Sequence, residues 1–464
     1  TFVEFGGKRV PVRLYRNTRA RRIILRIADR NGDGDGVSVT LPRRTPLREG
    51  LDLIHEKAAW VLERLGGLPP RVAFADGARV PLGGVDHTIR HVLDGRGVVR
   101  GQGTEILVAG GAEHLARRFR DWLRKEALER QIPMNLDWVQ NICSISKTFA
   151  TTALMQLWQQ GRFQLDDDVS DYMSFPVRNP SHADVPITFR LLLTHQSSIR
   201  DGEWYGRGYQ CGDPTVSLAE WIEGYLQPGG QFYDAPENFQ AWAPGDRWDY
   251  NNVAFGLVGY LVEQISGELF TDYCREHLFQ PLGLNETSWY LADIDLSRHV
   301  VPYTYVEGDE IRSPTWGGRP LGVILEGSGS TVPVGDGHHA SCAYNHPNFP
   351  DGFLRTSVRQ LSRFARAYLN GGVLDGQRIL EESTIREMFQ PQLPGGFGTQ
   401  GLTWYTYPDV RGKEVWGHGG SDPGINTGIR LVPDEGIAAI VFINTWGGNP
   451  SQMTRRLLEE APGL

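Results

Sequence analysis

Alternating apolar and polar residues dominate the start of the chain. The segments 9–15, 21–28 and 36–42 each alternate with a period of two, the pattern of a strand with one buried face. Turn-forming residues separate these segments, including the run Asn-Gly-Asp-Gly-Asp-Gly. Because consecutive strands joined by short turns usually pair with each other, the pattern predicts a β-meander with one arginine-rich face.

Segments of helical period follow. Residues 45–65 and 112–130 place apolar side chains three and four positions apart, which predicts amphipathic helices. Weaker strand patterns at 87–93 and 105–109 lie between them. We therefore expect a β-rich N-terminal module.

The remainder of the chain predicts longer elements. Residues 144–160 and 253–267 read as helices, and the first is followed directly by a glycine that suits a helix end. A strand at 403–408 precedes a hairpin at 428–444 that turns through Pro-Asp-Glu-Gly. Residues 303–348 show no clear period, so we expect a long loop of the kind that commonly lines a binding site.

Composition and charge divide the chain in two. Of its 464 residues 40% are hydrophobic, which is enough to bury more than one core. The longest apolar run, 437–443, is far shorter than the roughly 18 residues of a membrane span. Residues 1–130 carry 25 basic and 16 acidic residues, whereas the remainder carries 22 and 39. The asymmetry favours two modules, 1–133 and 134–464.

The cysteines and histidines predict neither a metal site nor a disulfide framework. The cysteines are far apart and form no Cys-x-x-Cys pair, so we expect mostly free thiols at Cys143, Cys211, Cys274 and Cys342. Histidines gather at 87–91 and at 338–346 without carboxylate or thiol partners at ligand-like spacing. We expect no metal and no cofactor.

Ser144 and Lys147 begin the predicted helix 144–160 and share one of its faces. The free N–H groups and the positive dipole end of a helix start stabilise negative charge, such as an oxyanion near Ser144. A neutral lysine amine can take the proton of a serine, whereas arginine cannot, and the chain has five lysines against 42 arginines. The pair fits a nucleophile and its base, although this spacing also arises by chance.

Two further motifs strengthen the catalytic interpretation. Tyr250-Asn251-Asn252 leads into the predicted helix 253–267, and a His-Gly-Gly-Ser run follows the predicted strand 403–408. Paired glycines beside a strand let a substrate approach the backbone. Each residue also has an ordinary structural explanation, such as a helix cap or a turn, so the weight lies on the combination.

In this order, the Ser-x-x-Lys, Tyr-x-Asn and His-Gly-Gly motifs resemble those of the serine β-lactamase and penicillin-binding-protein superfamily, in its esterase and D-peptidase branch. Flanking segments such as FRLLLTHQSSI and GHGGSDPGINTGIRLVPDEG are also similar, and the resemblance spans about residues 139–464. It implies an α/β (α+β) fold with an antiparallel sheet flanked by helices and a helical subdomain.

The resemblance also implies residue roles. Ser144 would be the acylated nucleophile, activated by Lys147, with Tyr250 as general acid/base and Asn252 orienting substrate and lysine. The third motif would bind substrate through His418, Gly419, Gly420 and Ser421, with the N–H groups of Ser144 and Ser421 as the oxyanion hole. A tyrosine acts as a base only where cations stabilise its phenolate, and Lys147 and a charged His418 are the candidates.

These roles predict a serine hydrolase that forms an acyl-enzyme with an ester or a small amide or peptide. Histidine in the third motif favours an esterase or D-peptidase over a β-lactamase, because it lacks the fixed charge suited to a β-lactam carboxylate. The alternative is a catalytically silent two-module protein whose basic N-terminal half binds an anionic partner. We expect no nucleic acid partner and no membrane span. The resemblance suggests the cell envelope or periplasm, but no signal peptide is visible.

The N-terminal 130 residues resemble the first half of the YgjP-like zinc metallopeptidases, through the arginine-rich strands and the segments EKAAWVLERL and WLRKEALER. The His-Glu-x-x-His motif that would bind zinc is absent from the sequence, which implies a truncated module without its chemistry. In the superfamily that the C-terminal part resembles, a helix and two strands normally precede the nucleophile and complete the sheet. Either the arginine-rich strands replace them or the domain is incomplete.

Overall fold

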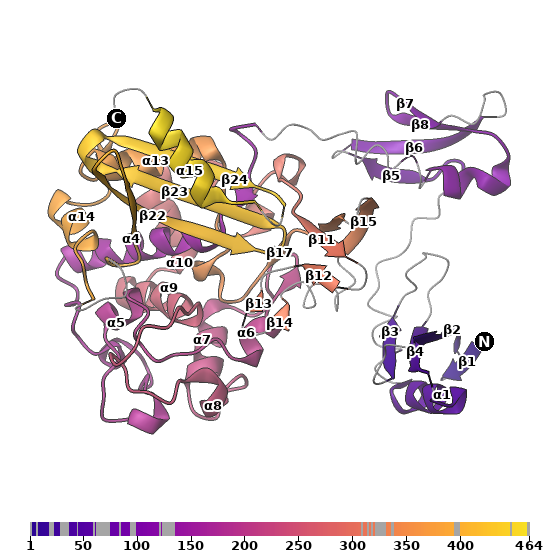
Figure 1. Cartoon of the computed structure of the whole chain (residues 1–464), viewed down its shortest axis with the longest axis horizontal. Helices are drawn as coiled ribbons and strands as arrows, with labels where there is room; N and C mark the ends of the chain where they lie inside the picture. The colour runs from indigo at the N-terminus through magenta and orange to yellow at the C-terminus, as the bar shows by residue number, and fades with distance from the viewer. Residues whose placement is uncertain are drawn as a thin grey trace. The chain divides into compact units, whose positions relative to one another are not determined.

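The computed structural model describes residues 2–5, 8–17, 23–27, 37–43, 45–58, 61, 75–82, 85–92, 99–119, 122, 135–307, 310–312, 315–316, 319–320, 331–335, 338–393, 400–445 and 448–461. The chain forms two compact units, Thr1–Arg120 and Asp121–Leu464. Each unit is described by itself below, with elements labelled as in Figure 1.

The first sheet of the first unit is not a meander. Its strand order is β1-β2-β4-β3, and β2 (Lys8–Asn17) pairs in parallel with β4 (Val37–Pro42), with Val12 opposite Val37. The apolar side chains of β4 are buried, which suits a central strand better than an edge strand. The other elements are β1 (Phe2–Phe5), β3 (Ile24–Ile27) and α1 (Leu47–Glu56).

A second sheet of the first unit has the order β5-β6-β8-β7. The predicted strands at 87–93 and 105–109 are confirmed as β6 (Val85–Val92) and β8 (Glu105–Ala109). A helical segment follows from 112 to 119, and most of the remaining predicted helix to 130 lies outside the described residues. The outer strands are β5 (Arg79–Leu82) and β7 (Val99–Gln102).

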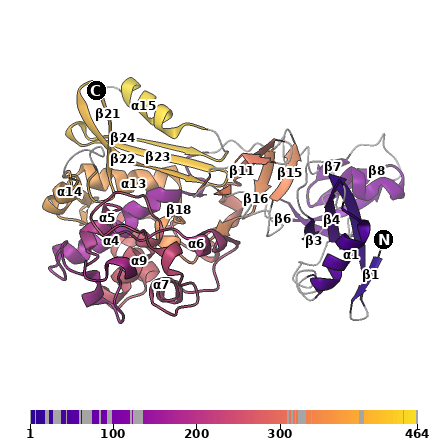
Figure 2. The same cartoon turned by 60° about the horizontal axis from the view of Figure 1, so that its bottom comes forward.

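The second unit is built on an antiparallel sheet with the order β21-β22-β23-β24. The predicted hairpin is confirmed as β23 (Ile425–Val432) and β24 (Ile437–Ile443), and Gly436 supplies the positive φ of 65° that ends its turn. Helix α15 (Pro450–Glu460) covers one face and α13 (Val358–Leu369) the other (Figure 2). The remaining strands are β21 (Tyr405–Val410) and β22 (Lys413–Asp422).

A helical layer packs beneath this sheet. Helix α9 (Val253–Ser266) is apolar on nearly all sides because it lies in the core, against α4 (Ser146–Gln159) and α7 (Leu218–Leu226). Gly267 ends α9 in a left-handed conformation. The sheet flanked by helices and the helical region confirm the predicted fold class.

No single described helix has the length and apolarity to cross a membrane. One pair of helices, Val253–Ser266 and Phe270–Leu282, has that length and apolarity when taken together, but the pair is bent by 84°.

The segment 303–348 differs from its predicted loop. It contains a sheet with the order β12-β11-β16-β15, which includes β11 (Tyr303–Glu307), β12 (Glu310–Arg312), β15 (Thr331–Gly335) and β16 (His338–Ser341). Its glycine-rich, polar composition hid the strand period.

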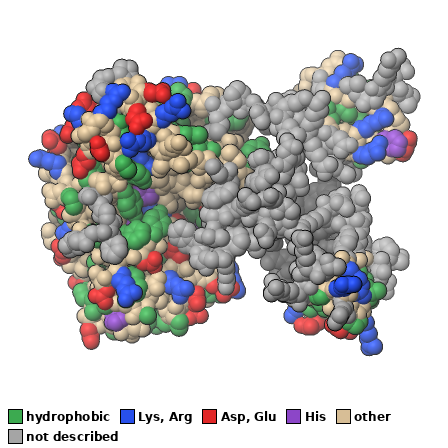
Figure 3. All heavy atoms as spheres, in the orientation of Figure 1, with side chains coloured by type: hydrophobic (Ala, Val, Ile, Leu, Met, Phe, Trp, Pro, Cys, Tyr) green, Lys and Arg blue, Asp and Glu red, His purple; other side chains and the backbone are tan. Residues whose placement is uncertain are grey.

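On the face drawn in Figure 3, acidic and basic side chains of the second unit are interspersed.

Two of the cysteines are joined, so the expectation of free thiols is wrong for this pair. Cys211 and Cys342 form a disulfide with their Cα atoms 5.8 Å apart, across 131 residues of sequence. The short strands β10 (Gln210–Cys211) and β17 (Tyr344–Asn345) pair and bring these distant segments together. Cys143 and Cys274 are free and buried.

Candidate active site

A tight turn before α4 presents Ser144. The turn, Cys143–Ile145 (η2), is a 3₁₀ turn, so Ser144 lies in this turn, two residues before the start of α4. Cys143 takes a left-handed φ of 50°, a conformation that costs a residue other than glycine about 1–3 kcal/mol. The Asn141 side-chain oxygen accepts the backbone N–H of Cys143 at 2.8 Å. The neighbours of Ser144 on both sides are buried, while Ser144 itself is half-buried. The turn therefore leaves this one hydroxyl accessible.

Lys147 lies fully buried below Ser144. Its Nζ donates to Ser144 Oγ at 3.0 Å, to Asn252 Oδ1 at 2.7 Å and to the backbone oxygen of Asp351 at 2.8 Å. Only the serine hydroxyl among these three acceptors can also donate a hydrogen bond. A neutral amine in this place would keep two N–H bonds and direct its lone pair at the Ser144 hydroxyl.

Asp201 fixes the orientation of Asn252 at the start of α9. Its carboxylate accepts the backbone N–H groups of Asn252 and Val253 at 2.9–3.0 Å and the Asn252 Nδ2 at 2.9 Å. The amide oxygen of Asn252 is thereby directed to Lys147. Burial raises the pKa of Asp201 to about 6, while the N–H groups of Val253 and Asn252 lower it.

Tyr250 lies beside the same lysine. Lys147 Nζ is 5.1 Å from the centre of the Tyr250 ring. The His195 ring stacks on the Tyr250 ring, with 4.3 Å between the ring centres. His195 Nδ1 accepts the N–H of Asn251 at 3.2 Å, so this histidine holds the loop that carries Tyr250. The structure thus gathers the first two motifs around Lys147.

Strand β22 brings the third motif against the nucleophile turn. A Cβ atom on Gly420 would lie 2.6 Å from the oxygen of Ile142 and 2.8 Å from Cys143 Cβ, so only glycine permits this approach. Thr427 on β23 donates to the same Ile142 oxygen at 2.8 Å. At Gly419 a Cβ would meet nothing closer than 3.9 Å.

His418 is buried and uncharged at neutral pH. Burial, with a smaller contribution from Lys147, lowers its pKa to about 3. Its Nδ1 lies 2.6 Å from the Gly419 oxygen, which places the proton on Nδ1, and Nε2 has no partner among the described residues. The expectation that a charged His418 stabilises a Tyr250 phenolate is therefore wrong, which leaves Lys147 as the candidate cation.

A pocket of about 340 Å³, part of it open to solvent, lies over Ser144. Ser144, Asn252 and Ser421 of the predicted site line it, while Lys147, Tyr250 and the His-Gly-Gly residues are not among the lining residues. The other lining residues are Cys143, Tyr205, Tyr209, Asp351, Gly352, Phe353 and Asp422.

Comparison with known proteins agrees with this architecture. The family model described as Beta-lactamase matches residues 86–461. The chain belongs to the Beta-lactamase family. Members of this family are serine hydrolases that include esterases, D-amino acid amidases and carboxypeptidases.

Relatives within the Beta-lactamase family are distant. Penicillin-binding protein 4 of Amycolatopsis lactamdurans is 27% identical over 72% of this chain and 80% of its own. The D-alanyl-D-alanine-carboxypeptidase/endopeptidase AmpH of Escherichia coli K12 is 26% identical over 44% of this chain, which spans about half of AmpH. The D-amino acid amidase of Ochrobactrum anthropi SV3, solved with L-phenylalanine, has a TM-score of 0.53 at 22% identity, over 70% of this chain and 84% of its own, and shares the fold.

Four hydroxyl- or carboxyl-bearing pocket residues of this Beta-lactamase family member were not predicted as site residues: Tyr205, Tyr209, Asp351 and Asp422. Asp422 directly follows Ser421, so its place beside the third motif was readable from the sequence. The two tyrosines and Asp351 lie in segments without a recognisable motif, and only the tertiary fold brings them to Ser144.

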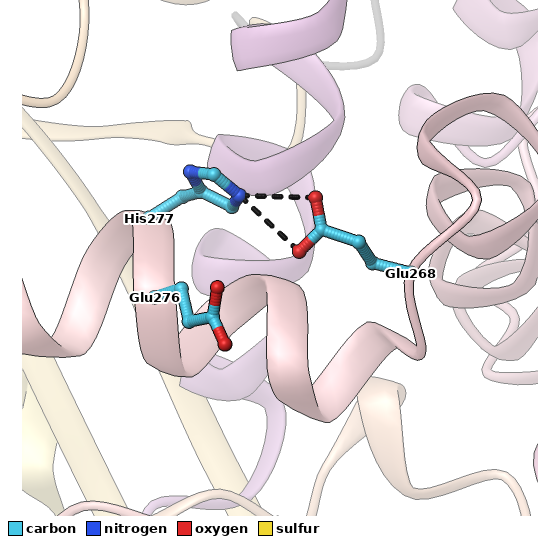
Figure 4. A group of neighbouring side chains, drawn as sticks. All are labelled: Glu268, Glu276 and His277. Carbon is cyan, nitrogen blue, oxygen red and sulfur yellow. Dashed lines mark hydrogen bonds and ion pairs between the residues drawn. The ribbon is translucent and has the colours of Figure 1, made fainter.

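One surface group outside the pocket has the donor types of a metal site. Glu268, Glu276 and His277 hold their ligand atoms within 4.8 Å of one another (Figure 4). His277 Nε2 lies 3.2 and 3.3 Å from the two carboxylate oxygens of Glu268, which is the geometry of an exposed ion pair. Because these contacts already engage the imidazole, the group supports no metal assignment.

Proposed function

We propose that this chain hydrolyses an ester or a small amide or peptide through an acyl-enzyme on Ser144. The observation that carries the proposal is the buried Lys147, whose Nζ lies 3.0 Å from Ser144 Oγ and is held by Asn252 Oδ1 and the Asp351 backbone oxygen. The proposal requires the neutral amine, whose lone pair can accept the serine proton.

The proposed reaction has two halves. Ser144 Oγ attacks the carbonyl carbon as its proton passes to Lys147, and the N–H groups of Ser144 and Ser421 stabilise the oxyanion. Collapse expels the alcohol or amine, which takes a proton from Tyr250. Water then attacks the acyl-enzyme and gives one proton to the Tyr250 phenolate. As the acid leaves, Lys147 returns its proton to Ser144 Oγ, which restores all three groups.

The proposed order of substrates places esters and D-amino acid amides or peptides before β-lactams. The neutral His418 supports it, because the third motif then offers no fixed positive charge to a β-lactam carboxylate. Faster hydrolysis of nitrocefin than of simple esters would reverse this order.

The test is covalent labelling with a fluorophosphonate, followed by intact-protein mass. We expect one adduct on the wild type and none on Ser144→Ala, while Ser297→Ala, which removes an exposed hydroxyl bonded to Asp295, labels like the wild type. A folded wild type without an adduct would overturn the proposal and leave the silent, anion-binding protein as the better explanation.

A further inference from the structure

Two buried carboxyl groups line the pocket over Ser144. The Tyr205 hydroxyl donates to Asp351 Oδ2 at 2.8 Å, and the Tyr209 hydroxyl donates to Asp422 Oδ1 at 2.9 Å. The residues Asp351 and Asp422 are only 2% and 4% exposed, respectively. Each carboxyl is thus anchored through one oxygen in the wall of the pocket.

One carboxyl oxygen of the pocket, on Asp351, is unsatisfied among the described residues. Asp351 Oδ1 is buried and accepts no hydrogen bond from the described residues. Lys147 Nζ lies 3.7 Å from Asp351 Oδ2, but its hydrogen bonds go to Ser144 Oγ, Asn252 Oδ1 and the Asp351 backbone oxygen. A buried carboxylate oxygen without a donor is costly, so this site is suited to a ligand that brings donors.

Arg355 is another buried cation, and its terminal nitrogens are bonded to backbone oxygens, while its Nε has no partner among the described residues. Arg355 is 1% exposed and donates to the backbone oxygens of Phe353, Trp289 and Tyr344. Its charge acts on Asp422, but no lysine or arginine is among the residues lining the pocket. The wall beside Ser144 therefore presents carboxyl groups and no cation that could bind a substrate carboxylate.

We infer that the pocket binds a primary ammonium group of the substrate through Asp351 and Asp422, so that the substrate is an ester or amide carrying a free amino group, such as an amino acid amide. This inference rests on the proposed function and narrows its substrate class. The ammonium makes only hydrogen bonds and ion pairs, and it takes no part in the bond changes at Ser144.

The titration of the carboxyl groups agrees with this assignment. Burial raises the pKa of Asp422 to about 8 and the pKa of Asp351 to about 6, and Lys147 lowers both. Without a ligand, the cost of burying these charges is thus only partly offset. A bound cation would stabilise the ionised forms.

The test is protection of Ser144 from the fluorophosphonate by alaninamide and by lactamide, in both enantiomers. The two amides differ only in an ammonium and a hydroxyl group. For the wild type we expect alaninamide to protect at concentrations at least about tenfold lower, which corresponds to about 1.4 kcal/mol. Asp422→Asn should bring the ratio of the two protecting concentrations, lactamide to alaninamide, towards one. Asp434→Asn, which removes an exposed carboxylate in the turn between β23 and β24, should leave this ratio unchanged.

The outcomes separate the two proposals. Labelling of the wild type with equal protection by both amides overturns the ammonium assignment and leaves the acyl-enzyme intact. Absence of labelling overturns the proposed function, and the assignment falls with it. If Asp422→Asn does not fold, Tyr209→Phe replaces it, because it keeps the ring and removes only the hydroxyl that holds Asp422. It should also reduce the ratio, and an unchanged ratio would count against the assignment.

Discussion

At the scale of single residues, the site depends on side chains that carry a proton or a charge without access to bulk water. The contact between Lys147 and Ser144 could be anticipated, because a serine and a lysine three residues apart share a helix face. The burial of Asp351 and Asp422 could not be anticipated, since an aspartate in a turn or at a strand end is usually solvated. Their burial arises only when Tyr205 and Tyr209 pack over them.

Replacing the base tests the proton transfer to Lys147. Lys147→Arg keeps a positive charge, but a guanidinium does not give up its proton, so we expect fluorophosphonate labelling to slow by about 10²–10⁴. Lys413→Arg, in an exposed ion pair with Glu435, should label at the wild-type rate. Labelling of Lys147→Arg within a few-fold of the wild type would show that another group takes the serine proton.

The titration of Asp422 predicts a pH-dependent stability. An unfolded aspartate loses its proton near pH 4, whereas burial holds the pKa of Asp422 at about 8. The folded chain therefore binds more protons in this window, and its free energy of unfolding falls as pH rises through it. In urea unfolding, Asp422→Asn should gain stability relative to the wild type from pH 4 to 8 and then level off. If the free energies of unfolding of the wild type and Asp422→Asn changed with pH in the same way, the raised pKa of Asp422 would be contradicted.

At the scale of elements, the sequence predicted the identity of helices and strands better than their partners. The helix 253–267 and the hairpin 428–444 followed from periodicity, because their side chains face a buried core. The parallel pairing of β2 with β4 did not follow, since alternation reveals a buried face but not a neighbour. The Cys211–Cys342 bond was equally hidden, because a separation of 131 residues says nothing about pairing.

Two adjacent glycines on β22 make a matched test of how closely this strand must approach the nucleophile turn. Gly420→Ala would place a methyl group 2.6 Å from the Ile142 oxygen and push the strand from Ser144, whereas Gly419→Ala has 3.9 Å of clearance. We expect labelling to slow by about 10² in the first variant, because misplacing the oxyanion donors by about 1 Å is that costly. Similar rates for both variants would mean that the approach is not needed.

At the scale of the whole molecule, the division into modules stays a prediction. The second unit has its own core around α4 and α9, and all residues that line the pocket lie between 143 and 422. We propose that the catalytic machinery belongs wholly to this unit and that the arginine-rich strands are not needed to complete its sheet.

Deleting residues 1–120 tests this proposal. The remaining chain should be folded and should label within about threefold of the full-length rate, since a domain with its own core can fold alone. The same deletion carrying Ser144→Ala gives the background. An insoluble or unlabelled product, beside an active full-length chain, would mean that the second unit needs residues of the first.

The pocket draws its walls from both ends of the catalytic unit, and this has a consequence for synthesis. Ser144 and Lys147 leave the ribosome early, but Ser421 and the glycine strand follow some 277 residues later, roughly 14–55 s at usual rates of translation. A nascent chain thus holds its nucleophile and base without the rest of the pocket. The proposed hydrolysis therefore requires that synthesis has passed Asp422, the last in sequence of the residues that line the pocket.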